Sequence, residues 1–317
     1  MRLRWMDYLV RNQKTSPIMI NIAIFGSTGS IGKNTIEIVK KFPEKFKVKA
    51  LVAQSSVKTL ASQANLLKPE YVIIENEKKY QELKELVNYK CNILSGRNEV
   101  EKIASEKFDL VISAIMGFAG MVPTINAIKA GNDIAIANKE SLVCAGSLIM
   151  KLTRENGVRM LPIDSEHNAI FQVFENENLD KISDVVLTAS GGPFLNSSKS
   201  FDKISVEEAL AHPKWKMGKK ISIDSATMMN KGLEMIEAYY LFPIKKNQID
   251  IVVHPQSIIH GIVNYRDGSS LSMMSSPDMK TPISNVLNYP NRMDINVNKV
   301  DLTKIGKLEF FAPNYEK

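Results

Sequence analysis

The sequence predicts an α/β protein in which a Rossmann-type doubly wound parallel sheet domain is followed by a second α/β domain. An apolar strand pattern leads directly into a glycine-rich turn and a helical pattern within residues 21–39. Short apolar runs then alternate with helical stretches as far as residue 163, which is typical of a parallel sheet covered by helices. The composition changes after Asp164 and Glu166, so we expect the second domain to begin there.

The first strand is expected over residues 21–25 and is followed by the turn GSTGSIG at residues 26–32. A helical pattern continues from Ile31 and stops before Pro43. Glycines permit a tight turn and close backbone approach, and the helix N-terminus faces an anion, so this context favours dinucleotide binding. The spacing is G-x-x-G-x-x-G rather than G-x-G-x-x-G, and a purely structural glycine turn is the alternative.

The second strand, residues 48–53, should end near the ribose of a bound dinucleotide. The residues that follow, Gln54, Ser55 and Ser56, include no acid, whereas an NAD site usually places an acid there. Lys58 is also close. This favours NADP over NAD.

Further strands and helices continue the alternation: strands over 71–74, 110–114 and 133–137, and helices over 78–87, 100–106 and up to Ala130. The sequence NKES at residues 138–141 then lies at the carboxyl end of a strand, where doubly wound sheets bind ligands. The alternative for these residues is a capped helix start.

Asp164 and Glu166 follow a strand expected over residues 158–163. On an extended segment their side chains would project from one face, and two such carboxylates suit a hard divalent cation. The alternative is a helix start, with Asp164 or Ser165 as N-cap and Glu166 in the first turn.

Three later stretches carry polar groups. A strand over 185–189 ends in a turn at Ser190 that could hold a phosphate, and a loop around Trp215 could close over a ligand. A helix over residues 224–238 would place Asn230 and Glu234 one turn apart, with Lys231 beside them. The alternative for the turn at Ser190 is an ordinary loop, and the alternative for the loop around Trp215 is a solvent-exposed loop. The alternative for the helix is an exposed polar face.

The composition limits the function classes. The 317 residues suffice for two domains, and the net charge of +7 comes from scattered lysines without a basic block interleaved with aromatics, which argues against nucleic-acid binding. No apolar run reaches transmembrane length, so we expect no membrane association.

Cys91 and Cys144 lack metal or redox spacing, which favours a cytoplasmic location. The basic residues 1–20 form an expected N-terminal extension without a signal-peptide core.

Together these motifs resemble the 1-deoxy-D-xylulose 5-phosphate reductoisomerase family. The resemblance covers nearly all of residues 21–317 and is carried by seven motifs in order, at residues 26–32, 138–143, 161–172, 190–194, 212–215, 224–234 and 254–257. It implies an enzyme that uses NADPH and Mn²⁺ or Mg²⁺, with Co²⁺ as a further option. The implied reaction rearranges and reduces 1-deoxy-D-xylulose 5-phosphate to 2-C-methyl-D-erythritol 4-phosphate, in isoprenoid precursor synthesis.

The resemblance also assigns roles to residues. The metal ligands would be Asp164, Glu166 and Glu234. The catalytic residues would be these three with Lys139 and His212. The substrate would be surrounded by Lys139, Ser165, Glu166, Ser190, His212, Ser225, Asn230, Lys231 and Glu234. The cofactor would contact Thr28, Gly29, Ser30, Ile31, Ser56, Asn138, Glu140 and Gly218.

The expected organisation is an N-terminal extension (1–20), an NADP-binding domain (21–163), a catalytic domain (164–288) and a linker (289–317). The family continues into a C-terminal helical domain, which we expect to be absent here. The resemblance further implies a phosphorylated small-molecule substrate, a homodimer and a cytoplasmic protein, with a plastid-type organelle as the alternative location.

Two other functions compete with this prediction. One is another NADP-dependent dehydrogenase of the semialdehyde type, which would need an activated cysteine. Cys144 lies in an expected helix without an evident basic partner, which disfavours this alternative. The other is a truncated, inactive remnant that binds dinucleotide without turnover.

Overall fold

The computed structural model describes residues 19–195, 197, 199–211 and 218–314, which divide between two compact units. Of these residues, unit 1 comprises 19–163 and 283–295. Unit 2 comprises the described residues of 164–282 and of 296–314. Most of the predicted N-terminal extension, and the predicted loop around Trp215, lie outside the described residues.

Unit 1 is built on a seven-stranded sheet whose ladders are all parallel, in the order β4-β3-β2-β1-β5-β6-β7. Its strands are β1 (Ile20–Phe25), β2 (Phe46–Ala53), β3 (Tyr71–Ile74), β4 (Asn92–Ser95), β5 (Leu110–Ser113), β6 (Asp133–Ile136) and β7 (Met160–Pro162). The centres of β1 and β5 are fully buried, which explains their unbroken apolar sequences.

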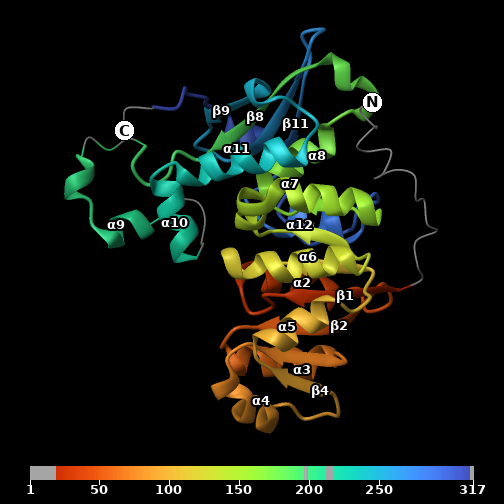
Figure 1. Cartoon of the computed structure of the whole chain (residues 1–317). Helices are drawn as coiled ribbons and strands as arrows, with labels where there is room; N and C mark the ends of the chain where they lie inside the picture. The colour runs from red at the N-terminus through yellow and green to blue at the C-terminus, as the bar shows by residue number, and fades with distance from the viewer. Residues whose placement is uncertain (1–18, 196, 198, 212–217, 315–317) are drawn as a thin grey trace. The chain divides into compact units, whose positions relative to one another are not determined.

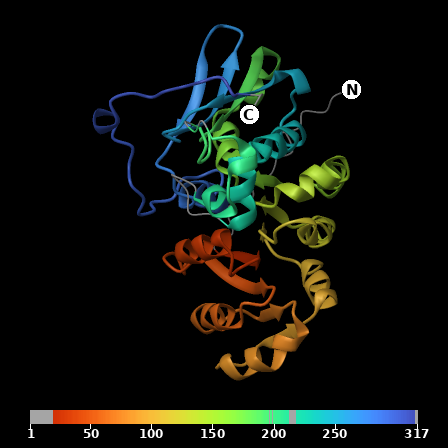
Figure 2. The same ribbon diagram turned by 90° about the vertical axis from the view of Figure 1, so that its left-hand side faces the viewer.

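Helices cover both faces of this sheet. They are α2 (Ser30–Val39), α3 (Val57–Leu67), α4 (Tyr80–Leu86), α5 (Arg97–Ala104), α6 (Met121–Lys129), α7 (Lys139–Asn156) and the part of α12 (Lys280–Leu287) from residue 283 onward (Figure 1). Figure 2 shows α2 and α3, in red to orange, on one side of the strands and α5 and α6, in yellow-orange, on the other. The predicted Rossmann-type doubly wound sheet is confirmed.

The strand order reverses between β1 and β5, so the turn after β1 lies at the topological switch point, where such sheets bind ligands. Gly26 has φ +90°, and a Cβ there would lie 2.4 Å from the Ala114 carbonyl oxygen. Only glycine fits this position, because both the backbone conformation and the contact with the backbone just after β5 exclude a side chain.

Unit 2 is built on a four-stranded mixed sheet in the order β11-β10-β8-β9. The strands are β8 (Ile182–Ala189), β9 (Ile249–Val253), β10 (Ile259–Tyr265) and β11 (Ser270–Met274); β8 and β9 are parallel and the other pairs antiparallel. The helices are α8 (Ser165–Val173), α9 (Val206–Leu210), α10 (Lys219–Ala226), α11 (Met229–Leu241) and α13 (Leu302–Ile305). Helix α8 packs against β10 and β11, and α11 packs against β8 and β9, which confirms a second α/β domain.

The segment before residue 312 contacts the end of β9. Phe311 and Val253 exchange two backbone hydrogen bonds of 2.9 Å, and the Phe310 ring stacks on His254 with centroids 4.6 Å apart. The Glu309 carbonyl oxygen lies 2.8 Å from Nδ1 of His254. The motif at residues 254–257 therefore anchors the last described segment of unit 2.

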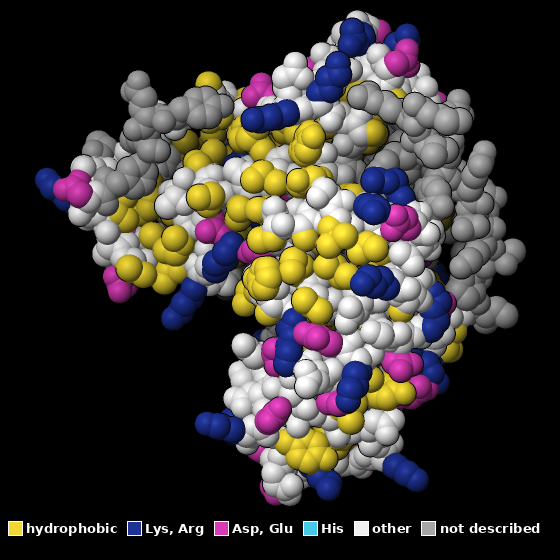
Figure 3. All heavy atoms as spheres, in the orientation of Figure 1, with side chains coloured by type: hydrophobic (Ala, Val, Ile, Leu, Met, Phe, Trp, Pro, Cys, Tyr) yellow, Lys and Arg dark blue, Asp and Glu magenta, His cyan; other side chains and the backbone are white. Residues whose placement is uncertain are grey.

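Within the described residues, no helix combines the length and apolar character that crossing a bilayer requires. On the face shown in Figure 3, Lys and Arg side chains lie among Asp and Glu rather than in one continuous basic patch.

Candidate active site

The glycine turn of unit 1 presents an open helix start. Gly29 is the N-cap of α2, and the first turn of that helix contains no acidic residue. Gly29 and Ser30 are exposed, whereas Thr28 and Ile31 are half-buried. Because the first N–H groups of a helix lack intrahelical partners, this turn can receive an anion such as a pyrophosphate.

The turn is held from behind by a residue that the sequence did not single out. The buried side chain of Gln63, on α3, donates a 2.9 Å hydrogen bond to the Ser27 carbonyl oxygen. A Cβ at Gly32 would lie 2.4 Å from the same carbonyl oxygen, so α2 can approach the turn only with glycine there. Gln63 lies 36 residues from Ser27, and no local pattern would have revealed the contact.

The residues after β2 are exposed, and Ser56 is the N-cap of α3. The Ser56 side chain makes no capping hydrogen bond, so its hydroxyl is not used to close the helix. This leaves the hydroxyl available to a ligand at the carboxyl edge of the sheet.

Asn138 is the N-cap of α7, as the capped-helix alternative proposed. Its Oδ1 accepts a 2.9 Å hydrogen bond from the Ser141 N–H, and its Nδ2 donates to the carbonyl oxygens of Gly117 (2.9 Å) and Ile115. Asn138 is 2% exposed, and its side-chain amide holds the loop after β5 in place. Lys139 is buried and Glu140 half-buried in the first turn of α7.

The paired carboxylates of unit 2 lie on a helix start, and the expectation of an extended segment is wrong. Asp164 is the N-cap of α8, while Ser165 and Glu166 occupy its first turn. A helix starts here because Asp164 directly follows the strand-like run in the N-cap position, and because an acidic residue such as Glu166 in the first turn offsets the helix dipole. The Asp164 side chain makes no capping bond, so its carboxylate is directed elsewhere.

The carboxylates of Asp164, Glu166 and Glu234 converge, with one oxygen from each within 4.8 Å of the others. Glu234 reaches this point from α11, where the sequence placed it one turn after Asn230, and the Asn230 amide donates to it. A divalent cation with ligand oxygens about 2.1–2.4 Å away fits between oxygens at such separations. The donor set is all carboxylate, which suits Mg²⁺ or Mn²⁺.

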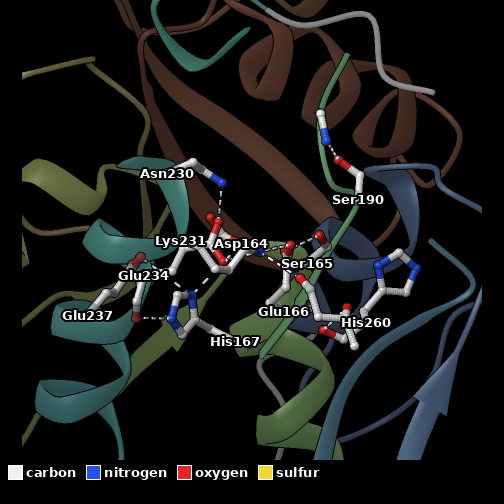
Figure 4. A network of polar contacts seen from close by, with 12 residues as sticks. Asp164, Ser165, Glu166, His167, Ser190, Asn230, Lys231, Glu234, Glu237 and His260 are labelled. Atoms are coloured by element: carbon white, nitrogen blue, oxygen red, sulfur yellow. Dashed lines mark hydrogen bonds and ion pairs between the residues drawn. The ribbon is translucent and has the colours of Figure 1, made fainter. Parts of the chain in front are cut away.

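Lys231 is embedded in this carboxylate cluster, as Figure 4 shows. Its ammonium lies 2.6 Å from a Glu166 oxygen, 2.6 Å from a Glu234 oxygen and 2.7 Å from the Thr188 carbonyl oxygen. Burial lowers the pKa of Lys231, but the carboxylates of Glu166 and Glu234 outweigh it, so the pKa is raised overall. One ammonium facing three carboxylates leaves a formal excess of two negative charges.

The excess negative charge changes the ionisation of Glu166. Burial, followed by the neighbouring Glu234 carboxylate, raises the pKa of Glu166 to about 8 despite the attraction of Lys231. The Ser165 hydroxyl donates a 2.5 Å hydrogen bond to the same carboxylate. A proton on Glu166 therefore relieves the repulsion that a bound cation would otherwise relieve.

We predict that divalent-cation binding depends steeply on pH. Below about pH 8 a cation must displace the Glu166 proton, so the dissociation constant for Mn²⁺ should fall by about tenfold per pH unit between pH 6 and pH 8 and then level off. Calorimetry in buffers of different ionisation enthalpy measures both the affinity and the proton released. Glu166→Gln should flatten the pH profile; an equally steep profile in that variant would contradict the assignment.

The predicted phosphate-binding residues of unit 2 come from neighbouring backbone segments. Ser190 follows β8, and its Oγ accepts a 3.2 Å hydrogen bond from the Gly192 N–H. A Cβ at Gly192 would lie 2.7 Å from the Ser225 carbonyl oxygen, so this turn closely approaches the end of α10. His212 lies outside the described residues, and Gly218 is the exposed N-cap of α10.

Three buried residues near this cluster were not among the predicted site residues. His167 and Glu237 lie within 4.8 Å of Asp164 through their ligand atoms, and both are fully buried. His260, on β10, lies 3.1 Å from the Ser275 hydroxyl, and burial lowers its pKa to about 4. Glu237 follows Glu234 by three residues, and this helical spacing was the one sequence signal for it.

Cys144, which the semialdehyde alternative would need as nucleophile, is instead exposed on α7.

Comparison with known proteins identifies the family. Family models match in three segments: 1-deoxy-D-xylulose 5-phosphate reductoisomerase at residues 22–146, its C-terminal domain at 160–242, and the DXP reductoisomerase C-terminal domain at 274–317. The 1-deoxy-D-xylulose 5-phosphate reductoisomerase of Endomicrobium trichonymphae is 48% identical over 303 residues, covering 94% of this chain and 79% of the relative.

Two solved structures agree with this. The Zymomonas mobilis enzyme in complex with NADPH superimposes with a TM-score of 0.88 at 42% identity, covering 94% of this chain and 78% of that one. A DOX-P reductoisomerase in complex with NADPH, fosmidomycin and magnesium gives 0.89 at 44% identity, covering 94% and 76%. The chain therefore belongs to the 1-deoxy-D-xylulose 5-phosphate reductoisomerase family.

Proposed function

We propose that this chain converts 1-deoxy-D-xylulose 5-phosphate to 2-C-methyl-D-erythritol 4-phosphate with NADPH and a divalent cation. The observation that carries the proposal is the convergence of Asp164, Glu166 and Glu234 around a buried ammonium in a chain of this family. Three clustered carboxylates facing one ammonium are tolerable when a cation or a proton joins them.

Asp164, Glu166 and Glu234 would hold Mg²⁺ or Mn²⁺, which fits their all-oxygen donor set. When bound, the cation supplies Lewis acidity toward adjacent substrate oxygens during carbon–carbon rearrangement. The residues of the chain orient the reacting groups and hold the fragments together, which makes bond re-formation effectively intramolecular. The relative with magnesium and fosmidomycin bound supports this assignment.

The substrate phosphate would be gripped by Ser190, Ser225, Asn230 and Lys231. Support comes from the close approach of the Gly192 backbone to Ser225. Asn230 and Lys231 donate to the carboxylates in this structure, so a bound cation would have to take their place there before these two side chains reach a phosphate. Because the phosphate is remote from the reacting carbons, its binding energy can be used to orient the substrate. We also assign Ser165 to substrate contact and, following the family pattern, Lys139 and His212 to substrate contact and catalysis.

NADPH would bind in unit 1 at the N-terminus of α2, through Thr28, Gly29, Ser30 and Ile31. The open helix start without a first-turn acid supports this, as does the Zymomonas mobilis relative with NADPH bound. Asn138, Glu140 and Gly218 are assigned to the nicotinamide side. The cofactor supplies hydride, and the protein provides its orientation.

The function is tested by turnover of the purified chain. Oxidation of NADPH should require both 1-deoxy-D-xylulose 5-phosphate and Mn²⁺, stop with a chelator, and yield 2-C-methyl-D-erythritol 4-phosphate by mass spectrometry. NADPH binding without turnover under any metal condition would contradict the proposal.

We predict a modest preference for NADPH over NADH. Ser55 and Ser56 follow β2 where an acid would select NADH, and their hydroxyls can bind a 2′-phosphate without adding positive charge. Ser56→Ala should reduce the ratio of kcat/KM values for the two cofactors, whereas Ser55→Lys should increase it. Selectivity for NADH in the unsubstituted chain would contradict this prediction.

We further propose a homodimeric protein of the cytoplasm, with the domain limits 21–163, 164–288 and 289–317. The dimer follows from the family resemblance. The free thiols of Cys91 and Cys144 are consistent with a reducing compartment. Analytical ultracentrifugation of the purified chain tests the oligomeric state.

A further inference from the structure

A buried histidine–glutamate pair lies directly behind the three proposed metal ligands. His167, on α8, and Glu237, on α11, are each 0% exposed. Glu237 follows Glu234 by one helical turn, and His167 follows Glu166 directly. A carboxylate buried this completely is costly unless a nearby group stabilises it, so its position calls for a specific role.

The His167 ring connects the two ligand-bearing helices. One ring nitrogen, Nε2, lies 2.9 Å from the backbone carbonyl oxygen of Glu234. Because a carbonyl oxygen only accepts hydrogen bonds, Nε2 carries the N–H. The other nitrogen, Nδ1, is turned toward the second carboxylate of α11, 3.4 Å from Glu237 Oε2, and toward Asp164 Oδ1 at 3.8 Å (Figure 4).

The face of the same ring is fixed by apolar packing. Phe242 lies parallel to His167, with centroids 6.5 Å apart and an interplanar angle of 22°. Phe242 in turn stacks on Phe174, which ends α8, at 5.4 Å. The ring of His167 is therefore restrained by the hydrogen bond at Nε2 and by packing on one face, and this holds Nδ1 toward the carboxylates of Glu237 and Asp164.

We propose that His167 and Glu237 act as a positioning pair that sets the place of the Asp164 carboxylate and the register of α11 relative to α8. They act through the ligands rather than as ligands themselves. The inference rests on the proposed metal centre at Asp164, Glu166 and Glu234. Groups that orient metal ligands in this way typically contribute 10- to 100-fold to metal affinity.

The experiment is a calorimetric Mn²⁺ titration of the full chain and three variants: Glu237→Gln, His167→Gln and the double variant. Glutamine at position 167 keeps a donor for the Glu234 carbonyl and removes the nitrogen that faces Glu237. Each single variant should bind Mn²⁺ about 10- to 100-fold more weakly. The Mn²⁺ affinity of the double variant should equal that of the single variant that binds Mn²⁺ more weakly, because each change breaks the same contact. Affinity for NADPH should stay within about twofold.

Phe174→Leu is the matched control, because it disturbs the same aromatic stack without touching a polar group. It should lower the melting temperature while leaving Mn²⁺ affinity unchanged. Glu237→Asp, which keeps the charge but shortens the reach, should fold and still bind Mn²⁺ more weakly than the unsubstituted chain.

Several results would overturn the inference. If Phe174→Leu weakens Mn²⁺ binding as strongly as Glu237→Gln, the pair serves general packing. Binding of two ions per chain would make His167 and Glu237 ligands of a second ion. An unchanged Mn²⁺ affinity in Glu237→Gln would disprove the positioning role but leave the proposed metal centre intact. Absence of Mn²⁺ binding in the unsubstituted chain would disprove the proposed metal centre as well.

Discussion

Glu234→Gln should abolish turnover while leaving NADPH binding nearly intact. Glutamine preserves the shape of the side chain but removes one of the three carboxylates that converge within 4.8 Å. Lewis-acid stabilisation by a bound cation is worth several kcal/mol, so kcat should fall by at least about 10³-fold. NADPH affinity should be preserved because the turn proposed to bind the pyrophosphate lies in unit 1. Steady-state kinetics and a fluorescence titration of NADPH measure the two effects.

Asp250→Asn provides the matched control. Asp250 lies on β9 in the same unit, is exposed, and its carboxylate accepts a hydrogen bond from the N–H of Ile251, the next residue. Its loss should leave kcat within about twofold, since substitutions at exposed sites have small effects. If Glu234→Gln retained more than a tenth of normal turnover at saturating Mn²⁺, the metal-ligand assignment would be wrong.

The fold of unit 1 was largely predictable because its strands are buried on both faces and read as short apolar runs. Strand β4 was missed, since Asn92 is exposed and the rest of the strand only partly buried, so no apolar run marks it. In unit 2, strand β11 is mostly exposed and β10 contains a glycine. A Cβ at Gly261 would lie 2.8 Å from Ile170 Cγ1 and 3.0 Å from the Glu166 carbonyl oxygen, so glycine lets α8 approach β10 closely, a tertiary contact that no local pattern encodes.

The candidate site was predictable in its residue types and less so in its geometry. The carboxylates were identified from their chemistry, although their helix start was assigned first to an extended segment. The partners that hold them were not identified. His167 meets Glu237 across 70 positions of the chain, and Gln63 meets Ser27 across 36. Such contacts depend on the packing of whole elements, whereas motifs record only neighbours along the chain.

Lys231→Met should destabilise the metal-free protein strongly. Lys231 is 4% exposed, and its ammonium contacts two carboxylates at 2.6 Å each. Removing one partner of a buried ion pair leaves uncompensated charge and typically costs about 3–5 kcal/mol of unfolding free energy. Saturating Mn²⁺ should restore much of this loss, because the cation supplies the missing positive charge and binds only the folded state. Turnover should remain low even then, since the proposed phosphate grip lacks its ammonium.

Denaturant unfolding with and without Mn²⁺ measures these effects, and Lys220→Met is the control. Lys220 pairs with Asp224 at 2.8 Å, but its side chain is 50% exposed. Exposed pairs contribute about 0–1 kcal/mol, so this variant should be nearly as stable as the unsubstituted chain. Combining Lys231→Met with Glu234→Gln should recover part of the lost stability, because it removes a carboxylate that the ammonium contacts at 2.6 Å and that Lys231→Met leaves without a counter-charge. If Lys231→Met were no less stable than Lys220→Met, the carboxylates would not depend on the ammonium for compensation.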